Sequence, residues 1–521
     1  MTRRGLRSLH SLLAGTAVLL NVSCSGNLVK TQEQEPPPKQ YAEKLEFELT
    51  EANVRNYFMR YDGVASHALT TSGLAPRVVW AFPAENTGIG VWFYPPAQPT
   101  EIVMSTKLAP VERADGMWGV TSTLTSDAPQ LRVKKAVLGN VRNVRDYFYG
   151  ATIPPEFDYE LNAGDASATL RLDCLDGVHH IELKLEYLNG TKGGIEGSQL
   201  VFHAGPSGKI ELKATALIDY PQLTGIPKEQ LVTADAANNP TALNALAFLS
   251  YEEKLMAGSW RFLTYFGRDT LLSLRMLMPV LQPRVMEAGL GAVVDRIGTN
   301  GQVAHEEALG DYAWVVRVGN KEQPPPPPGN MFSTWLDYKM IDADFILPAV
   351  IAEYAATPTG QQRIQAFLNR KTPSGETYQT ALKRNIDLVV QRATPFTQNQ
   401  KATNLVSIMH PEVGNWRDSG AGLGFGKYPY DVNVSLVPAP LRASWAPTPA
   451  APPPSTPWPP SGSRRPRPSS RSRSTRRPPW SASPPMPTAR GWIPVRRWSP
   501  SPARSPTAPC RSTPTALPCR S

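Results

Sequence analysis

The chain has 521 residues, with 54 Lys and Arg against 44 Asp and Glu, which gives a formal net charge of +10. The positive charge comes from residues 442–521, which contain 14 Arg, 22 Pro and no acidic residue, whereas the rest of the chain holds 40 basic and 44 acidic side chains. The charge therefore gives no reason to expect nucleic-acid binding outside that tail. Only Cys174 lies between Cys24 and the tail, which excludes a disulfide framework and a cysteine-based metal site.

The first 24 residues have the pattern of an export signal. Three arginines within residues 3–7 precede an apolar stretch over 12–20 that is too short to span a membrane as a helix. Cys24 follows small residues and resembles the lipidated cysteine of bacterial lipoproteins, with ordinary cleavage as the alternative. Residues 25–44 are polar and predict a tether. We expect a lipid-anchored protein of the bacterial cell envelope, at the outer membrane or the periplasmic face.

Residues 45–235 are predicted to form strands. Apolar and polar residues alternate there between Gly, Pro, Asn and Asp, and no helical pattern intervenes. The predicted strands lie in 77–83, 88–95, 130–139, 168–177, 180–190, 199–205 and 209–221. Short strands with frequent turns are typical of an antiparallel β-sandwich, which we expect over residues 45–235. Cys174 is predicted to be a buried strand residue.

From Pro240 the apolar residues recur with the spacing of helices. The predicted helices lie in 240–258, 269–281, 283–298, 304–318, 342–356, 361–370, 376–392 and 431–441. A proline run at 324–328 is expected in a loop between two of them. The pattern predicts a second, helical domain over residues 240–441.

The tail over 442–521 changes composition abruptly. It lacks Asp, Glu, Lys, Asn, Gln, His, Phe and Tyr, so it cannot build an apolar core and is expected to be disordered. The missing types are largely those with AT-rich codons, and we interpret the tail as out-of-frame translation of a GC-rich gene. A natural low-complexity tail is the alternative.

Common catalytic motifs do not match on spacing. His305 and Glu306 begin a segment in which Leu309 occupies the place of the second histidine of a zinc peptidase. Neither a phosphate-binding glycine loop nor a nucleophile elbow occurs. The sequence therefore predicts neither a metal nor a cofactor.

Acidic, basic and aromatic residues gather instead at predicted helix starts and loops. Each acid has a simpler interpretation: Asp269 as the cap of a helix from Thr270, Glu306 in a first helical turn, Asp342 as a cap, and Asp418 in a turn. Taken together, these acidic, basic and aromatic side chains suit the binding and cleavage of a carbohydrate. Arginine and carboxylate groups bind sugar hydroxyls, aromatic rings stack on sugar faces, and cleavage of an acetal needs a carboxylic acid and a carboxylate.

Four segments resemble a known family: YFGRDTLLSLRML, GQVAHEEALGDYA, DYKMIDADFILP and GNWRDSGAGLGFGKYPYDVN. They are similar to the six-hairpin, or (α/α)6-barrel, glycosidases, in particular glycogen-debranching amylo-1,6-glucosidases and glucoamylase-like enzymes. The resemblance covers about residues 240–440. It implies a β-sandwich followed by an (α/α)6 toroid, truncated here because such a barrel needs about twelve helices and about eight are predicted.

The resemblance also implies an activity and a site. It implies an exported glycoside hydrolase that acts on oligo- or polysaccharides, α-glucosides first, by an inverting mechanism without metal or cofactor. Asp418 matches the general acid, with Trp416 as a wall beside it, and Arg268 and Asp269 match the pair that holds the terminal sugar. Further substrate-binding positions are Glu306, Asp342 and Tyr265.

Two parts of this expectation stay open. The catalytic base usually comes from the C-terminal part of the barrel, and no residue is assigned to it here. A carbohydrate-binding lipoprotein without catalysis, or a surface scaffold, is the alternative to an enzyme. The oligomeric state is not predicted.

Overall fold

The computed structural model describes residues 44–443, apart from residue 62 and the segments 323–329, 410–412 and 418–420. The predicted export signal with Cys24, residues 25–43 of the tether, the proline run, residues 444–521 of the tail and Asp418 lie outside the described residues, so the predictions about them stay predictions. The tail was predicted to be disordered from residue 442, but residues 442 and 443 still belong to a helix, Pro438–Ala443. None of the helices in the described part of the chain has the length and apolar character that crossing a membrane requires.

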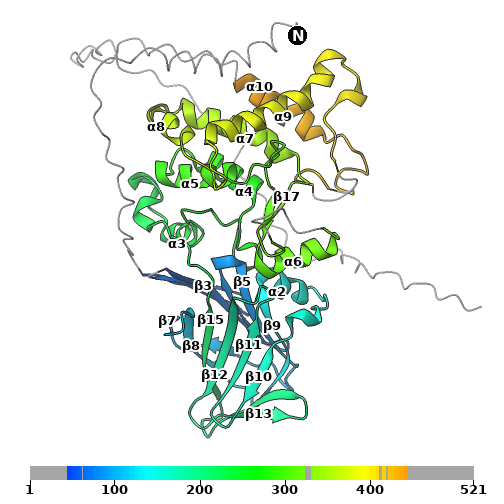
Figure 1. Ribbon diagram of the computed structural model, residues 1–521. Coiled ribbons are helices and arrows are strands. Elements are labelled where there is room, and N and C mark those ends of the chain that lie inside the picture. The colour runs from blue at the N-terminus through cyan, green and yellow to red at the C-terminus, as the bar shows by residue number, and fades with distance from the viewer. Residues whose placement is uncertain (1–43, 62, 323–329, 410–412, 418–420, 444–521) are drawn as a thin grey trace, which may run out of the picture. The chain divides into compact units, whose positions relative to one another are not determined.

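Two antiparallel sheets form the N-terminal part of the described chain (Figure 1). One has the order β1-β2-β3-β4-β5-β9-β14-β13, and the other has the order β10-β11-β12-β15-β8-β6, with β7 also paired to β8. The strands are β1 Leu45–Glu51, β2 Val54–Tyr61, β3 Val64–Thr71, β4 Arg77–Phe82, β5 Thr87–Phe93, β6 Ile102–Met104, β7 Ala109–Glu112, β8 Trp118–Ser126, β9 Gln130–Asn140, β10 Glu160–Ala163, β11 Ser167–Asp173, β12 His180–Tyr187, β13 Lys192–Glu196, β14 Gln199–His203 and β15 Ile210–Ile218. All seven predicted strand segments are strands.

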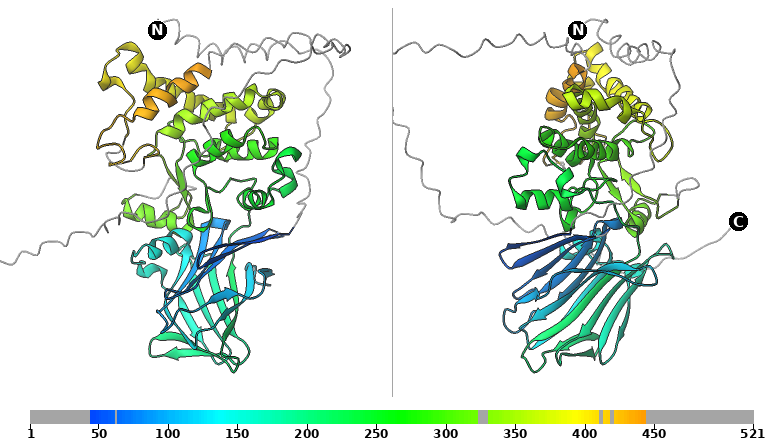
Figure 2. Two further views of the ribbon diagram at one scale, coloured as in Figure 1. Left: turned by 180° about the vertical axis from the view of Figure 1, so that it is seen from behind. Right: turned by 90° about the vertical axis from the view of Figure 1, so that its left-hand side faces the viewer.

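The two sheets pack face to face through their apolar sides (Figure 2). Trp80 and Leu138 of the first sheet share one core with Trp118 and Leu183 of the second. Strand β11 shows the cause, because every second side chain is buried, as the two-residue period of a strand requires. Cys174, directly after β11, is buried as predicted.

Helices make up most of the chain after residue 240. Their bounds are α3 Pro240–Phe248, α4 Gly267–Leu277, α5 Pro283–Val294, α6 Gly310–Gly319, α7 Asp342–Ala356, α8 Pro358–Leu368, α9 Tyr378–Gln398 and α10 Pro438–Ala443, and the earlier helix α2 Val141–Phe148 follows β9. An antiparallel β part followed by a helical part is therefore confirmed. The predicted helix over 240–258 ends at Phe248, and the one over 431–441 is a π-helical turn at Val432–Leu436 followed by α10.

The prediction of one helix over 304–318 is wrong at its start. Glu306–Ala308 form strand β16, which pairs with β17, Trp335–Asp337, and α6 begins only at Gly310. Gly310 has a φ of +48°, a left-handed conformation that glycine adopts readily, and this turns the chain from strand to helix.

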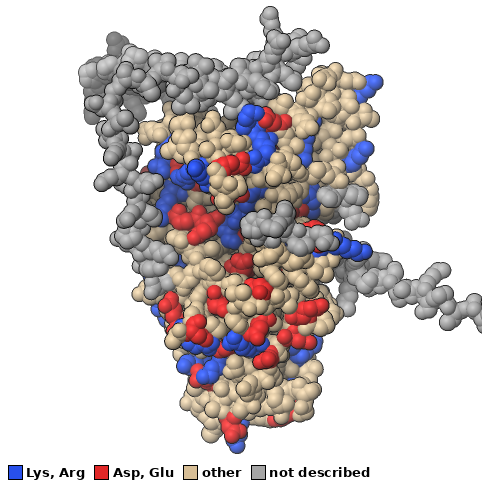
Figure 3. All heavy atoms as spheres, viewed as in Figure 1, with Lys and Arg blue, Asp and Glu red and all other residues tan. Residues whose placement is uncertain are grey.

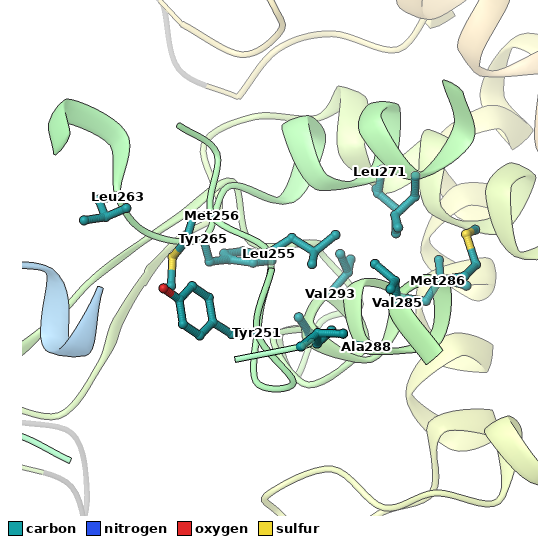
Figure 4. Close-up of a cluster of buried hydrophobic side chains, with 14 of the residues drawn as sticks. Tyr251, Leu255, Met256, Leu263, Tyr265, Leu271, Val285, Met286, Ala288 and Val293 are labelled. Atoms are coloured by element: carbon teal, nitrogen blue, oxygen red, sulfur yellow. The ribbon is translucent and has the colours of Figure 1, made fainter. Parts of the chain in front are cut away.

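Helix α7 lies at the centre of the helical part, in contact with α4, α8, α9 and α10. It is apolar on most of its circumference, as expected of a helix surrounded by others. Figure 4 shows part of the adjoining core, where Leu271 of α4 lies near Val285 and Val293 of α5. The same core continues to Phe58 of the first sheet.

Figure 3 shows basic and acidic side chains interspersed over the viewed face, without one dominant sign.

Candidate functional site

Glu306 is held in strand β16, which pairs with β17. It lies opposite Asp337 in the ladder and forms an isolated bridge with Phe266, so its backbone is fixed on both sides. Arg142 Nη2 of α2 donates to Glu306 Oε2 at 2.6 Å, and Lys339 Nζ is 3.7 Å from Oε1. Burial raises the pKa of Glu306, but the charges of Arg142 and Lys339 outweigh it and hold the pKa below its ordinary value. Glu306 is therefore an anion that accepts hydrogen bonds.

A pocket of about 960 Å³ opens beside Glu306. Tyr312, Trp335 and Tyr338 supply aromatic side chains to its walls, and Arg142 and Lys339 supply positive charge. The pocket thus joins elements distant in sequence. Arg142 belongs to α2 in the sheet part, Tyr312 belongs to α6, and Trp335, Tyr338 and Lys339 lie between α6 and α7. Its size is at the upper end of ordinary small-molecule pockets.

Arg268 and Asp342 form a second charged group, at the start of two helices. Arg268 Nη1 is 3.1 Å from Asp342 Oδ2, and the Asp342 side chain is only 1 % exposed. Burial raises the pKa of Asp342, an effect that the charge of Arg268 opposes. Asp269 Oδ2 is 4.0 Å from Arg268 Nε, and its side chain is 47 % exposed. Since α4 begins at Gly267 and no side chain caps it, the interpretation of Asp269 as a cap before Thr270 is wrong.

His305 connects these two charged groups. Its carbonyl accepts from Gly267 N at 2.8 Å, and its own N–H donates to Asp337 O at 2.6 Å. Its ring is buried, edge-on to Phe266, and Nδ1 has no hydrogen-bond partner among the described residues. Burial lowers the pKa of His305, and both Glu306 and Arg268 act on it electrostatically. The hydrogen bond between Gly267 N and His305 O therefore brings the backbone next to Arg268 against the backbone next to Glu306.

Trp416 belongs to a loop attached to the start of α7. Ile341 N donates to Gly414 O at 2.8 Å, and Asn415 Nδ2 donates to Asp431 Oδ1 at 2.9 Å. The Trp416 side chain is half exposed, and the Arg417 guanidinium lies 4.3 Å above its ring. Arg417 thus covers one face of the expected aromatic wall. Asp418, the predicted general acid, follows directly but lies outside the described residues.

Tyr265 lies in the core. It is fully buried among apolar side chains (Figure 4). Its hydroxyl donates to Ala304 O at 3.2 Å, and the Arg296 guanidinium is 4.6 Å from its ring centre. Burial raises the pKa of Tyr265. Its ring is therefore not exposed for contact with a sugar. Its hydroxyl instead holds the backbone at Ala304, directly before His305.

A buried ion cluster explains why β16 is a strand. Glu307 accepts from Lys254 Nζ at 2.5 Å, from Thr264 Oγ1 at 2.6 Å and from Arg296 at 2.9 Å, with 1 % of its side chain exposed. Burial raises the pKa of Glu307, but the two cations outweigh it and bring the pKa to about 2. A helical start would remove Glu307 from these partners. Strand alternation then directs the neighbouring Glu306 away from the cluster.

Of the predicted site residues that the structure describes, only Glu306 lines the pocket, and the prediction missed the residues around it. Tyr338 and Lys339 lie within a segment that carried the family resemblance, so their position was a signal for them. No signal in the sequence pointed to Arg142, because 164 residues separate it from Glu306. No group of three or more His, Cys, Asp or Glu in the described ranges is placed to hold a metal ion.

Comparison with known proteins adds no relative: no protein-family model and no curated protein matches this chain.

Proposed function

We propose that this protein is an exported glycoside hydrolase that binds oligo- or polysaccharides, with α-glucosides as the first substrates to test. The observation that carries the proposal is the pocket in which Glu306 stands as an anion beside Arg142 and Lys339, with aromatic side chains on the walls. Aromatic faces suit the C–H faces of sugar rings, and fixed charged groups suit their hydroxyls. The Arg268–Asp342 pair is buried, with 12 % and 1 % of the two side chains exposed.

The helical part is proposed to be a truncated (α/α)6 toroid. Contacts between α4 and α5, and between α7 and α8, support this proposal, because helices consecutive in the chain pack together as in helical hairpins. Loops between such hairpins meet at one end of a ring, where they can present the residues of one site.

Asp418 is proposed as the general acid of an inverting mechanism. Glu306 is unsuited to that role, because its lowered pKa keeps it ionised near neutral pH. The loop that leads to Asp418 is hydrogen-bonded to the start of α7, next to the Arg268–Asp342 pair. A second carboxylate about 6.5–9.5 Å from Asp418 would activate water, and no residue is assigned to it.

Calorimetry with maltose-like and branched oligosaccharides tests the binding site. We expect the full chain to bind at least one of them, and Glu306→Gln to weaken that binding about tenfold, since a hydrogen bond to a charged group contributes about 1.5–3 kcal/mol. Glu353→Gln is the matched control, because Glu353 forms an exposed ion pair with Arg275 away from the pocket. A chain that binds no sugar would favour a surface scaffold.

Turnover of the same oligosaccharides separates an enzyme from a binding protein. The truncated chain is proposed to be inactive if its barrel lacks the catalytic base, so turnover is measured in the protein whose downstream reading frame restores the barrel. There, Asp418→Asn should retain sugar binding and reduce turnover by about 10² to 10⁴, the usual contribution of a positioned acid. Asp269→Ala should weaken binding and turnover together. Binding without turnover in the parent protein would favour a carbohydrate-binding lipoprotein, and parent-like hydrolysis by Asp418→Asn would show that Asp418 is not the acid.

A further inference from the structure

Two arginines meet at one phenylalanine ring. Arg77 begins β4, Phe148 ends α2, and Arg261 lies in a short 3-10 helix over Trp260–Phe262. The guanidinium carbon of each arginine lies 4.7 Å from the centre of the Phe148 ring. Arg261 also lies 5.1 Å from the Trp260 ring and 5.7 Å from the Tyr149 ring. Three separate elements thus bring two positive charges and three aromatic rings together.

The charges of Arg77 and Arg261 have no counterion in the part of the chain that the structure describes. Neither guanidinium forms an ion pair or a hydrogen bond there, and Arg261 Nε is buried without a partner. Burial lowers the pKa of Arg77, and the charge of Arg261 lowers it further. A nearby carboxylate would have the opposite effect on this pKa. The two arginines therefore repel each other without compensation.

Other arginines near this place each have an acceptor for part of the guanidinium group, although Arg142 Nε is also buried without a partner. Arg142 and Arg145 of α2 pair with Glu306 and Asp146, and Arg60 of β2 donates to carbonyl groups. Stacking on Phe148 involves only the faces of the Arg77 and Arg261 guanidinium groups. Each guanidinium has five N–H donors in its plane, and apart from the buried Arg261 Nε these remain available to an acceptor.

We propose that Arg77 and Arg261 form a binding site for an oxyanion, a carboxylate or phosphate group, with Phe148, Tyr149 and Trp260 as an apolar floor for the body that carries it. Guanidinium groups match the geometry of both oxyanions, and an anion bound to either arginine would offset the repulsion between the two. Both arginines are partly exposed and Tyr149 is 65 % exposed, so a ligand can reach them.

This site is distinct from the pocket beside Glu306. None of these five residues is among those that line the pocket. Trp260 N donates to His67 Nδ1 of β3 at 3.2 Å, which fixes the 3-10 helix against the first sheet. The position of Arg261 is thereby set by the fold, and the inference does not depend on the proposed glycosidase activity.

Calorimetry on the full chain at low salt tests this site with two anions, inorganic phosphate and D-glucuronate. Neutral D-glucose, which lacks the carboxylate of glucuronate, serves as the uncharged control. We expect phosphate and glucuronate to bind and to compete, with an affinity that falls as salt is added. Arg77→Met and Arg261→Met should each weaken binding about tenfold or more, since each removes charge-assisted hydrogen bonds. Binding of only one anion would identify phosphate or carboxylate as the natural group.

Matched variants separate this site from the pocket and from general charge effects. Arg171→Met should leave anion affinity unchanged, because Arg171 already pairs with Asp173 on β11. Glu306→Gln should also leave it unchanged, so loss of sugar binding and loss of anion binding are separable. Arg77→Lys keeps the charge and should bind more weakly than the parent but better than Arg77→Met. The proposal is overturned if the parent binds neither anion, or if the methionine or lysine variants bind as the parent does.

Discussion

His67 of β3 is a buried histidine whose two ring nitrogens both have partners. Nδ1 accepts from Trp260 N at 3.2 Å, and Nε2 lies 3.1 Å from Asn56 Oδ1. The ring also stacks on Phe58, with the ring centres 4.0 Å apart. Because Nδ1 accepts a hydrogen bond, the proton must be on Nε2, which donates to Asn56. Burial lowers the pKa of His67 to about 3.

This histidine predicts a loss of stability in acid. Between pH 6.5 and pH 3 the unfolded chain binds a proton at His67 and the folded chain does not, so the free energy of unfolding falls as the pH falls. The contribution approaches about 1.4 kcal/mol per pH unit. Urea unfolding across this range should show a shallower pH dependence for His67→Gln than for the parent protein.

A suitable control is His203→Gln, since His203 lies at the surface on β14. The His67 variant should be less stable than the parent near neutral pH, because it loses the ring contacts, so the comparison rests on the slope. An unchanged slope would mean that His67 is not kept neutral by burial.

Helix α4 begins where the backbone of another segment touches it. A Cβ atom on Gly267 would lie 2.2 Å from Ala304 O and 2.7 Å from the Tyr265 hydroxyl, too close for either to remain in place. Gly267 N also donates to His305 O at 2.8 Å. The absence of a side chain at Gly267 therefore allows the start of α4, with Arg268, to lie against the segment that ends in Glu306.

Gly267→Ala should destabilise the protein by about 1–3 kcal/mol, as overpacking does in other proteins. It should also weaken sugar binding, because α4 and the His305 segment must move apart. Chemical unfolding measures the first effect. Gly319→Ala in α6 is the control, since nothing lies within 4 Å of its added Cβ, and there alanine should stabilise by up to about 1 kcal/mol. Equal stabilities for the two variants would show that the contact at Gly267 is not tight.

The sheet part and the helical part share one apolar core. Phe58 of β2 packs edge-on against Phe248 of α3, with ring centres 5.0 Å apart, and both belong to the cluster that contains the cores of α4, α5 and α7. Beside them, Arg60 of β2 donates to the carbonyl groups of Ile226, at 2.7 Å, and Ser250, at 3.1 Å, and also to Ala247. These contacts predict that sheets and helices unfold together.

Arg60→Met tests this coupling. It keeps the apolar stem but leaves three buried carbonyl groups without this donor, so we expect a loss of about 1–3 kcal/mol or more. In the parent protein, thermal transitions followed by far-UV and near-UV circular dichroism should coincide. Arg55→Met should have little effect, because Arg55 and its partner Glu101 are exposed. Two well-separated transitions in the parent would show that the shared core does not couple the parts.

Local pattern was sufficient to predict that a region of strands precedes a region of helices in this protein. It was wrong about helix α2, which lies among the strands and was not predicted, and about β16, which was predicted as the start of a helix. Alternation in β11 and the helical spacing in α7 each arise from side chains that are close in sequence, and both predictions are correct. Cys174 was likewise predictable as a buried residue, because the apolar pattern around it indicates an internal strand.

Long-range contacts determined the candidate site and overruled local pattern where the two conflicted. The acidic pair Glu306 and Glu307 has the composition of a helix start, but burial of Glu307 between Lys254 and Arg296 and the pairing of β16 with β17 favour a strand. Tyr265 has the sequence context of a substrate contact and yet lies in the core. The ion pairs and hydrogen bonds around the site gain strength only when burial excludes water, and burial depends on which distant segments fold together. For this reason the spacing of residues along the chain predicted the elements, and the folded chain alone brought Arg142 to Glu306 and Arg77 to Arg261.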